Sequence, residues 1–119
     1  MTVALLARDL MIASRIAAAA ERAGLPFTRC HDPGLLPPPA EVRLLLVDWG
    51  DRAAGWGERI GQWCADAPES ARPRVLLFGP HVDLAAHAAA RSAGLGPMIA
   101  RSKLVADLDS LLRNPGPPA

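Results

Sequence analysis

Short apolar runs alternate with helical segments along almost the whole chain, and this alternation limits the fold more than any other feature of the sequence. Five apolar runs are candidate strands, at residues 3–7, 27–30, 42–47, 75–78 and 98–100. Four segments have a helical pattern, at residues 10–23, from about 51 to 64, at 84–93 and at 104–112. Strands that alternate with helices in this way imply parallel strands joined by right-handed crossovers.

The predicted fold class is α/β, with a five-stranded parallel sheet in the order 2-1-3-4-5 and helices on both faces, a flavodoxin-like three-layer sandwich. The segment that should hold the second helix contains Asp32-Pro33-Gly34 and Pro37-Pro38-Pro39. Because consecutive prolines cannot lie inside a helix, we expect that helix to be absent or reduced to one turn. Residues 1–113 form one domain, and residues 114–119 are expected to be a flexible tail rich in proline and glycine.

The composition argues against several classes of function. The 119 residues include 13 basic and 12 acidic side chains, and 4% are aromatic. Nucleic-acid binders need a basic excess or stacking aromatics, so no nucleic-acid partner is expected. No apolar run reaches the roughly 18 residues of a membrane span, and the N-terminal charges follow the apolar run, unlike those of a signal peptide. Cys30 and Cys64 carry no CxxC pattern and suit free thiols, which are typical of a reducing compartment. Together with the missing apolar span, this leads us to expect a cytoplasmic protein that does not associate with membranes.

Charged side chains follow three of the predicted strands at the point where each strand ends. Arg8 and Asp9 come after the first strand, Asp48 after the third and Arg101 after the fifth, while Gly79 ends the fourth. The carboxyl ends of parallel strands meet at one edge of the sheet, beside the reversal in strand order, where ligands usually bind. We therefore expect these residues to converge on one site.

The chain resembles a response-regulator receiver domain over nearly all of its length. The resemblance rests on Leu5-Leu6-Ala7-Arg8-Asp9, Leu44-Leu45-Leu46-Val47-Asp48-Trp49, Val75-Leu76-Leu77-Phe78-Gly79 and Ile99-Ala100-Arg101-Ser102. It implies that Asp48 takes the position of the phospho-accepting aspartate. It also implies that Asp9 is the second of the two acidic residues that hold a divalent metal in receivers.

Three positions depart from the receiver pattern. Arg8 stands where the first metal-holding acidic residue is expected, Gly79 where a Ser or Thr contacts the phosphoryl group, and Arg101 where a lysine is nearly invariant. These departures resemble a degenerate receiver, or pseudo-receiver. Because Mg²⁺ prefers carboxylate oxygens and arginine keeps its charge, we expect Arg8 and Arg101 to pair with Asp9 and Asp48. Such a site would be nearly indifferent to magnesium.

Three functions follow from these features. The predicted one is a stand-alone pseudo-receiver, not an enzyme, that regulates signalling by binding a protein partner without a metal or cofactor. The first alternative is a live single-domain response regulator, phosphorylated on Asp48 by a histidine kinase with Mg²⁺. The second is a small flavodoxin-like nucleotide or flavin binder, although the sequence has neither GxGxxG nor a P-loop.

The last helical segment predicts an interaction surface. Its apolar residues are Leu104, Val105, Leu108, Leu111 and Leu112, more than one core-facing stripe needs. The preceding helix is rich in alanine, which would let a partner approach closely. We expect this surface to form a weak homodimer or to bind a protein partner.

Overall fold

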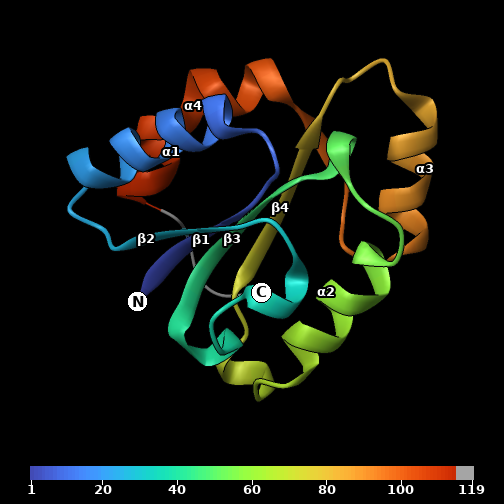
Figure 1. Ribbon diagram of the computed structural model, residues 1–119, viewed down its shortest axis with the longest axis horizontal. Coiled ribbons are helices and arrows are strands. Elements are labelled where there is room, and N and C mark those ends of the chain that lie inside the picture. The colour runs from blue at the N-terminus through green and yellow to red at the C-terminus, as the bar shows by residue number, and fades with distance from the viewer. Residues whose placement is uncertain (115–119) are drawn as a thin grey trace.

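Runs of Val, Leu, Ile and Ala form a parallel sheet in the computed structural model, which describes residues 1–114 (Figure 1). The strands are β1 (Thr2–Leu6), β2 (Phe27–Cys30), β3 (Val42–Asp48), β4 (Arg74–Gly79) and β5 (Met98–Ala100). They pair in the order β2-β1-β3-β4-β5, and every pairing is parallel. The predicted α/β class and strand order are confirmed.

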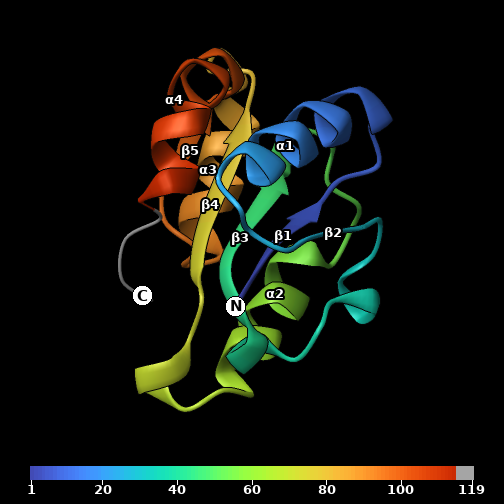
Figure 2. The same cartoon turned by 90° about the vertical axis from the view of Figure 1, so that its left-hand side faces the viewer.

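Helices cover both faces of this sheet. They are α1 (Leu10–Arg22), α2 (Trp56–Ala65), α3 (Leu84–Ser92) and α4 (Arg101–Arg113). Aspartates cap two of them, since Asp9 accepts from the Met11 N–H at 2.8 Å and Asp83 from the Ala86 N–H at 3.0 Å. Figure 2 shows α1 and α4 side by side on one face, and the other face is covered by α2 and α3.

Alternate residues of the central strands enter two separate cores. On the side of α1 and α4, Leu44 and Leu46 of β3 pack with apolar residues of those helices. On the side of α2 and α3, Leu45 and Val47 pack with the tryptophans of α2. Both faces of β3 are therefore buried, which explains why its sequence is a continuous apolar run.

The crossover from β2 to β3 contains no α-helix, as the prolines predicted. Two short 3₁₀ turns, Pro33–Leu35 and Pro39–Glu41, stand in its place. The indole N–H of Trp63 on α2 donates to the Pro37 carbonyl at 2.8 Å. Arg59 on α2 pairs with Asp32 through two contacts of 2.9 and 2.7 Å. The crossover segment is thus fastened to α2 instead of forming a helix of its own.

The basis of the predicted interaction surface on α4 is wrong. Leu104, Leu108 and Leu112 are at most 3% exposed, because they face the core shared with α1 and β1. Val105 and Leu111 are half-buried and pack against the same core. The helix lies close to the sheet and to α1, so all five apolar side chains are used within the chain. The apolar surplus from which the surface was predicted is therefore reduced to the partly exposed Val105 and Leu111, and association through α4 stays a prediction.

The described residues bear on three smaller expectations. The second helix begins at Trp56 rather than near residue 51, because Gly55 has a left-handed φ of 83° and ends the preceding loop. Cys30 and Cys64 are free thiols. No helix within residues 1–114 has the length and apolar content needed to cross a bilayer. The predicted tail falls mostly on residues 115–119, which lie outside the described part of the chain.

Candidate functional site

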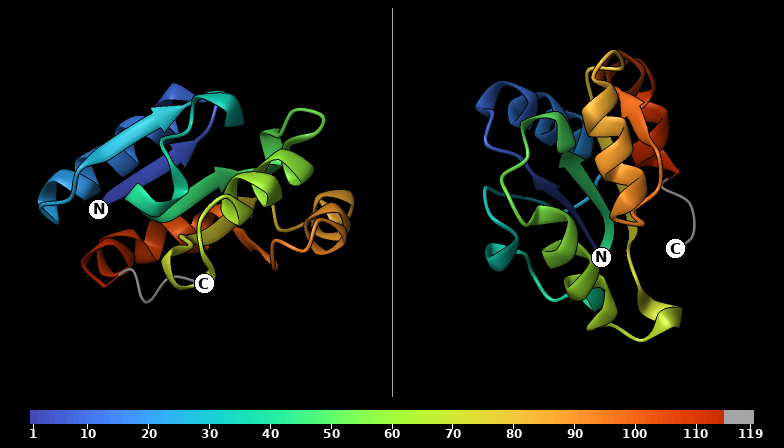
Figure 3. Two further views of the ribbon diagram at one scale, coloured as in Figure 1. Left: turned by 90° about the horizontal axis from the view of Figure 1, so that it is seen from below. Right: turned by 90° about the vertical axis from the view of Figure 1, so that its right-hand side faces the viewer.

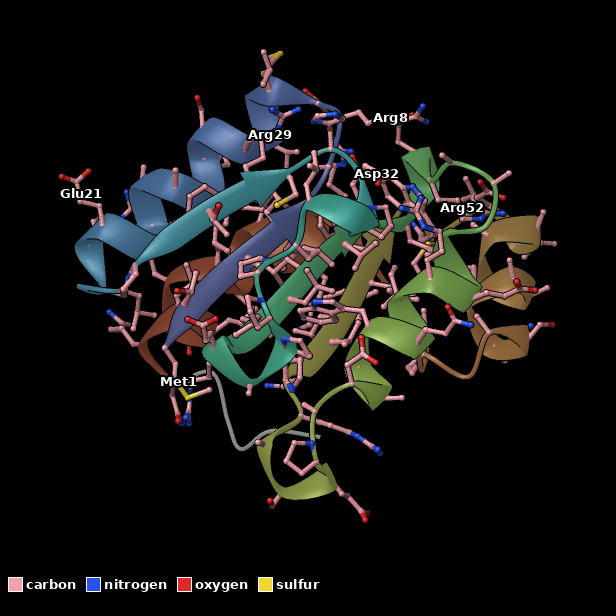
Figure 4. The ribbon with its side chains drawn as sticks, turned by 60° about the horizontal axis from the view of Figure 1, so that its bottom comes forward. Met1, Arg8, Glu21, Arg29, Asp32 and Arg52 are labelled. Atoms are coloured by element: carbon pink, nitrogen blue, oxygen red, sulfur yellow. The ribbon has the colours of Figure 1, made fainter. Side chains whose placement is uncertain are left out.

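The carboxyl ends of β1, β3, β4 and β5 bring the predicted site residues to one edge of the sheet. Asp48 is the last residue of β3, and Arg101 is the first residue of α4, directly after β5. Figure 4 shows Arg8 at this edge, whereas Met1 lies at the opposite end of β1. The convergence expected from the topology therefore occurs.

Arg101 joins the two carboxylates of the site. Its Nη2 lies 3.1 Å from Asp48 Oδ2, and its Nη1 lies 3.4 Å from Asp9 Oδ2. The guanidinium also lies over the Phe78 ring, 5.8 Å from the ring centroid. The pairing predicted for Arg101 with both carboxylates is confirmed, and a single cation bridges side chains that would otherwise repel.

Asp48 is the buried member of the bridge. It is 1% exposed, and its Oδ1 has no hydrogen-bond partner within residues 1–114. Burial raises the pKa of this carboxyl because it disfavours the charged form, and the charge of Arg101 only partly opposes that effect. The pKa of Asp9 is instead lowered, chiefly by the hydrogen bond from the Met11 N–H and then by Arg101.

Arg8 departs from the expectation. Its guanidinium pairs with the Asp51 carboxylate at 3.1 Å and donates to the Asp51 carbonyl, rather than pairing with Asp48 or Asp9. Asp51 ends the 3₁₀ turn η3 (Trp49–Asp51), which follows β3 and lies next to the end of β1. The prediction missed Asp51 because nothing in the sequence shows that this turn folds back towards Arg8.

The position of Gly79 leaves no room for a side chain. A Cβ at Gly79 would lie 2.8 Å from the Met98 sulfur and 3.0 Å from the Gly50 backbone nitrogen. A Cβ at Gly50 would lie 2.6 Å from Cδ of Pro80. The turn after β3 therefore rests directly on the end of β4. A serine or threonine hydroxyl at residue 79 would require this contact to open.

The residues present do not fit a magnesium site of the kind that the resemblance implies. A guanidinium nitrogen contacts each of the two carboxylates, and Arg8 stands where the resemblance implies the first metal-holding acidic residue. Within residues 1–114, no three His, Cys, Asp or Glu side chains form a group suited to a metal ion. Mg²⁺ requires near-octahedral oxygen ligands, which this set of donors cannot supply while Arg101 bridges it.

Comparisons with known proteins agree on the fold. No protein-family model and no curated protein sequence matches the chain. Among solved structures, a response regulator receiver domain from Rhodospirillum rubrum matches with a TM-score of 0.64 and 17% identity, over 95% of this chain and 92% of that one. A chain from the Saccharomyces cerevisiae co-crystal structure of the histidine phosphotransfer protein Ypd1 with the receiver domain of Ssk1 matches with a TM-score of 0.62 and 7% identity, over 96% and 92%. The chain has the fold of response-regulator receiver domains.

Proposed function

We propose that this chain is a signalling module of the receiver type that binds a protein partner and in which Asp48 is not phosphorylated in the ordinary magnesium-dependent way. The proposal rests on the bridge of Arg101 between Asp9 and Asp48. The guanidinium supplies positive charge where a divalent cation would otherwise be needed. That charge is permanent, because arginine does not lose its proton in the working pH range.

Two features of the site would make phosphoryl transfer to Asp48 slow. Such transfer depends on positioning and on neutralising the charge of the transferred group, for which enzymes and receivers use metal ions. Here one oxygen of the buried carboxylate is engaged by Arg101, and Gly79 provides no hydroxyl for a phosphoryl group. The module accordingly keeps one conformation, with Asp48 unphosphorylated, and its binding to a partner does not depend on phosphorylation.

Intact-mass measurement after incubation with acetyl phosphate and magnesium tests this proposal. We expect the unmodified protein to keep its mass. The Asp48→Asn variant is the matched control, since any adduct that it also forms does not lie on Asp48. An adduct that forms on the unmodified protein at once and is lost in Asp48→Asn would contradict the proposal.

A live receiver, phosphorylated on Asp48 by a histidine kinase, is the second candidate. One observation favours it: Asp48 Oδ1, although buried, has no hydrogen-bond partner within residues 1–114, so a phosphoryl group bonded to it would replace no existing hydrogen bond. The receiver domain of Ssk1, named in one of the structural matches, was crystallised with a histidine phosphotransfer protein. The adduct described above would establish this alternative.

A further inference from the structure

A cleft opens between α3 and the loop that leads into α2. Figure 3 (right) shows this loop, α2 and α3 on the same side of the molecule. The cleft has a volume of about 530 Å³, which lies in the range of small-molecule sites. Small residues leave this space open, and two largely buried tryptophans, Trp49 and Trp56, complete the apolar lining of Ala53, Gly57, Ala89 and Ala93. The cleft therefore has room for an apolar group as large as an aromatic ring.

One wall of the cleft is built from Trp49 and Arg52. The Trp49 indole N–H donates to the Ala86 carbonyl of α3 at 2.9 Å, which fixes the ring. The Arg52 guanidinium lies over this ring at 5.0 Å from its centroid, and its Nη1 donates to the Trp49 carbonyl at 3.1 Å. A guanidinium has five N–H groups, so most of those of Arg52 remain for a ligand in the cleft.

The same cleft is lined by two opposite charges that have no ion-pair partner. Arg52 and Glu58 both line it, and within residues 1–114 neither forms an ion pair, with the other or with any further side chain. Their neighbours Asp51 and Arg59, in contrast, each pair with a charged residue of another segment. A ligand that carries both a carboxylate and an ammonium group would pair with both charges through charge-assisted hydrogen bonds.

We infer that this cleft binds a free amino acid with a large apolar side chain. The Arg52 guanidinium donates to the α-carboxylate, Glu58 accepts from the α-ammonium group, and the side chain lies against Ala89 and Ala93. A nucleotide matches the cleft less well, because its phosphate leaves Glu58 without a positive partner. A residue inside a peptide has neither charged group. The inference goes beyond the proposed function, since neither Asp48 nor a protein partner takes part.

NMR titration of the unmodified chain with L-phenylalanine and L-leucine tests the inference. We expect a Kd of about 1 mM or below for at least one of them, with shifts of the Gly57, Ala89 and Ala93 amide signals. L-phenylalaninamide, which also represents a peptide N-terminus, lacks the carboxylate, and N-acetyl-L-phenylalanine lacks the ammonium group. Each should bind at least about tenfold more weakly than L-phenylalanine, the effect of losing one charge-assisted hydrogen bond. No binding of either amino acid at about 10 mM, or equal binding of L-phenylalanine and its two derivatives, would overturn the inference.

Two variants locate the ligand within the chain. Arg52→Gln and Glu58→Gln each remove one charge from the cleft, and each should weaken L-phenylalanine binding at least about tenfold. Arg91→Gln and Glu21→Gln are the matched controls, because both residues are exposed and lie outside the cleft, and they should leave binding unchanged. Unchanged binding by Arg52→Gln and Glu58→Gln would show that the inference is wrong. Because no phosphoryl transfer is involved, this inference and the proposed function can fail independently.

Discussion

Asp48 illustrates, at the scale of a single residue, how burial and charge oppose each other in this site. Its carboxyl has one ionic partner, and yet burial raises its pKa above the ordinary value of 3.8. A carboxyl with a raised pKa in the folded state binds its proton more tightly there than in the unfolded chain. Its contribution to stability is therefore full below pH 3.8 and is lost as the pH rises through the folded pKa.

Asp48→Asn should accordingly raise the melting temperature at pH 7, because the amide removes the cost of a buried charge. The difference between the two proteins should narrow as the pH falls towards 4, where Asp48 takes up its proton. Thermal unfolding followed by circular dichroism between pH 4 and 7 measures this. Asp51→Asn, at a half-exposed position paired with Arg8, is the control and should change stability by less than about 1 kcal/mol. A less stable Asp48→Asn protein at pH 7 would mean that the bridge to Arg101 outweighs the cost of burial.

Gly79 gives a second prediction at this scale. Gly79→Ala should destabilise the protein by about 1–3 kcal/mol, because the added methyl group meets the backbone of Gly50 and the sulfur of Met98. Gly61→Ala is the matched control, since a Cβ there meets nothing within 4 Å and alanine favours the helical backbone. The control should stabilise by about 0.4–1 kcal/mol. Urea unfolding measures the change in the free energy of unfolding of each variant. Equal changes would show that η3 moves away from β4 to make room for the added methyl group.

The individual site residues show what the sequence can and cannot predict. The position of Asp48, Asp9 and Arg101 at one edge follows from strand ends, so the topology alone predicted it. The partner of Arg8 depends on the path of the turn that holds Asp51, and the bond from Trp49 to Ala86 depends on where α3 lies. Both are details of loop geometry, which short-range sequence patterns do not determine.

At the scale of elements, the crossover between β2 and β3 replaces a helix with two short turns and a few specific contacts. Prolines made the absence of the helix predictable, because three of them in succession exclude helical hydrogen bonding. The fastening of this segment by Trp63 and Arg59 was not predictable, because both residues lie on α2, far along the chain. Similarly, the apolar stripe on α4 predicts more exposed apolar surface than the structure has, because the sequence does not reveal how closely α1 and the sheet surround that helix.

Trp63→Phe should therefore destabilise the protein by about 1 kcal/mol. The ring continues to fill the core beside α2, but the Pro37 carbonyl loses its donor. Arg59→Met, the control, removes a pair whose side chains are both more than 40% exposed and should cost less than about 1 kcal/mol. Chemical unfolding measures the free energy of unfolding of the two variants. A larger loss for Arg59→Met than for Trp63→Phe would show that the ion pair, and not the indole, holds the crossover.

At the scale of the whole molecule, the sheet divides the chain into two cores that meet the site from opposite sides. Arg101 begins α4, which packs with α1, whereas Trp49 enters the core of α2 and α3. Asp48, at the end of the central strand, is linked to both halves through these two neighbours, by the ion pair with Arg101 and by the peptide bond to Trp49. A cation at this point affects the entire domain, so its binding should be visible in global unfolding.

The stability of the unmodified protein should hardly respond to magnesium. A cation present at ten times its Kd would raise stability by about 1.4 kcal/mol and the melting temperature by about 6 °C. We expect a shift below about 1 °C in 10 mM MgCl₂, because Arg101 already bridges Asp9 and Asp48. Arg8→Asp alone should bind magnesium weakly, since that bridge remains.

The double variant Arg8→Asp with Arg101→Lys should gain a melting shift of a few degrees in magnesium, because it adds a carboxylate and replaces the forked guanidinium with a compact ammonium. Arg91→Asp, which makes the same charge change at an exposed position on α3, is the control and should show no magnesium dependence. Calorimetric scans with and without MgCl₂, and with CaCl₂ for ion selectivity, complete the measurement. If the melting temperature of the unmodified protein rose by several degrees in magnesium, the metal would be displacing the Arg101 guanidinium from the two carboxylates. The site would then be one that can bind Mg²⁺ and support phosphorylation of Asp48.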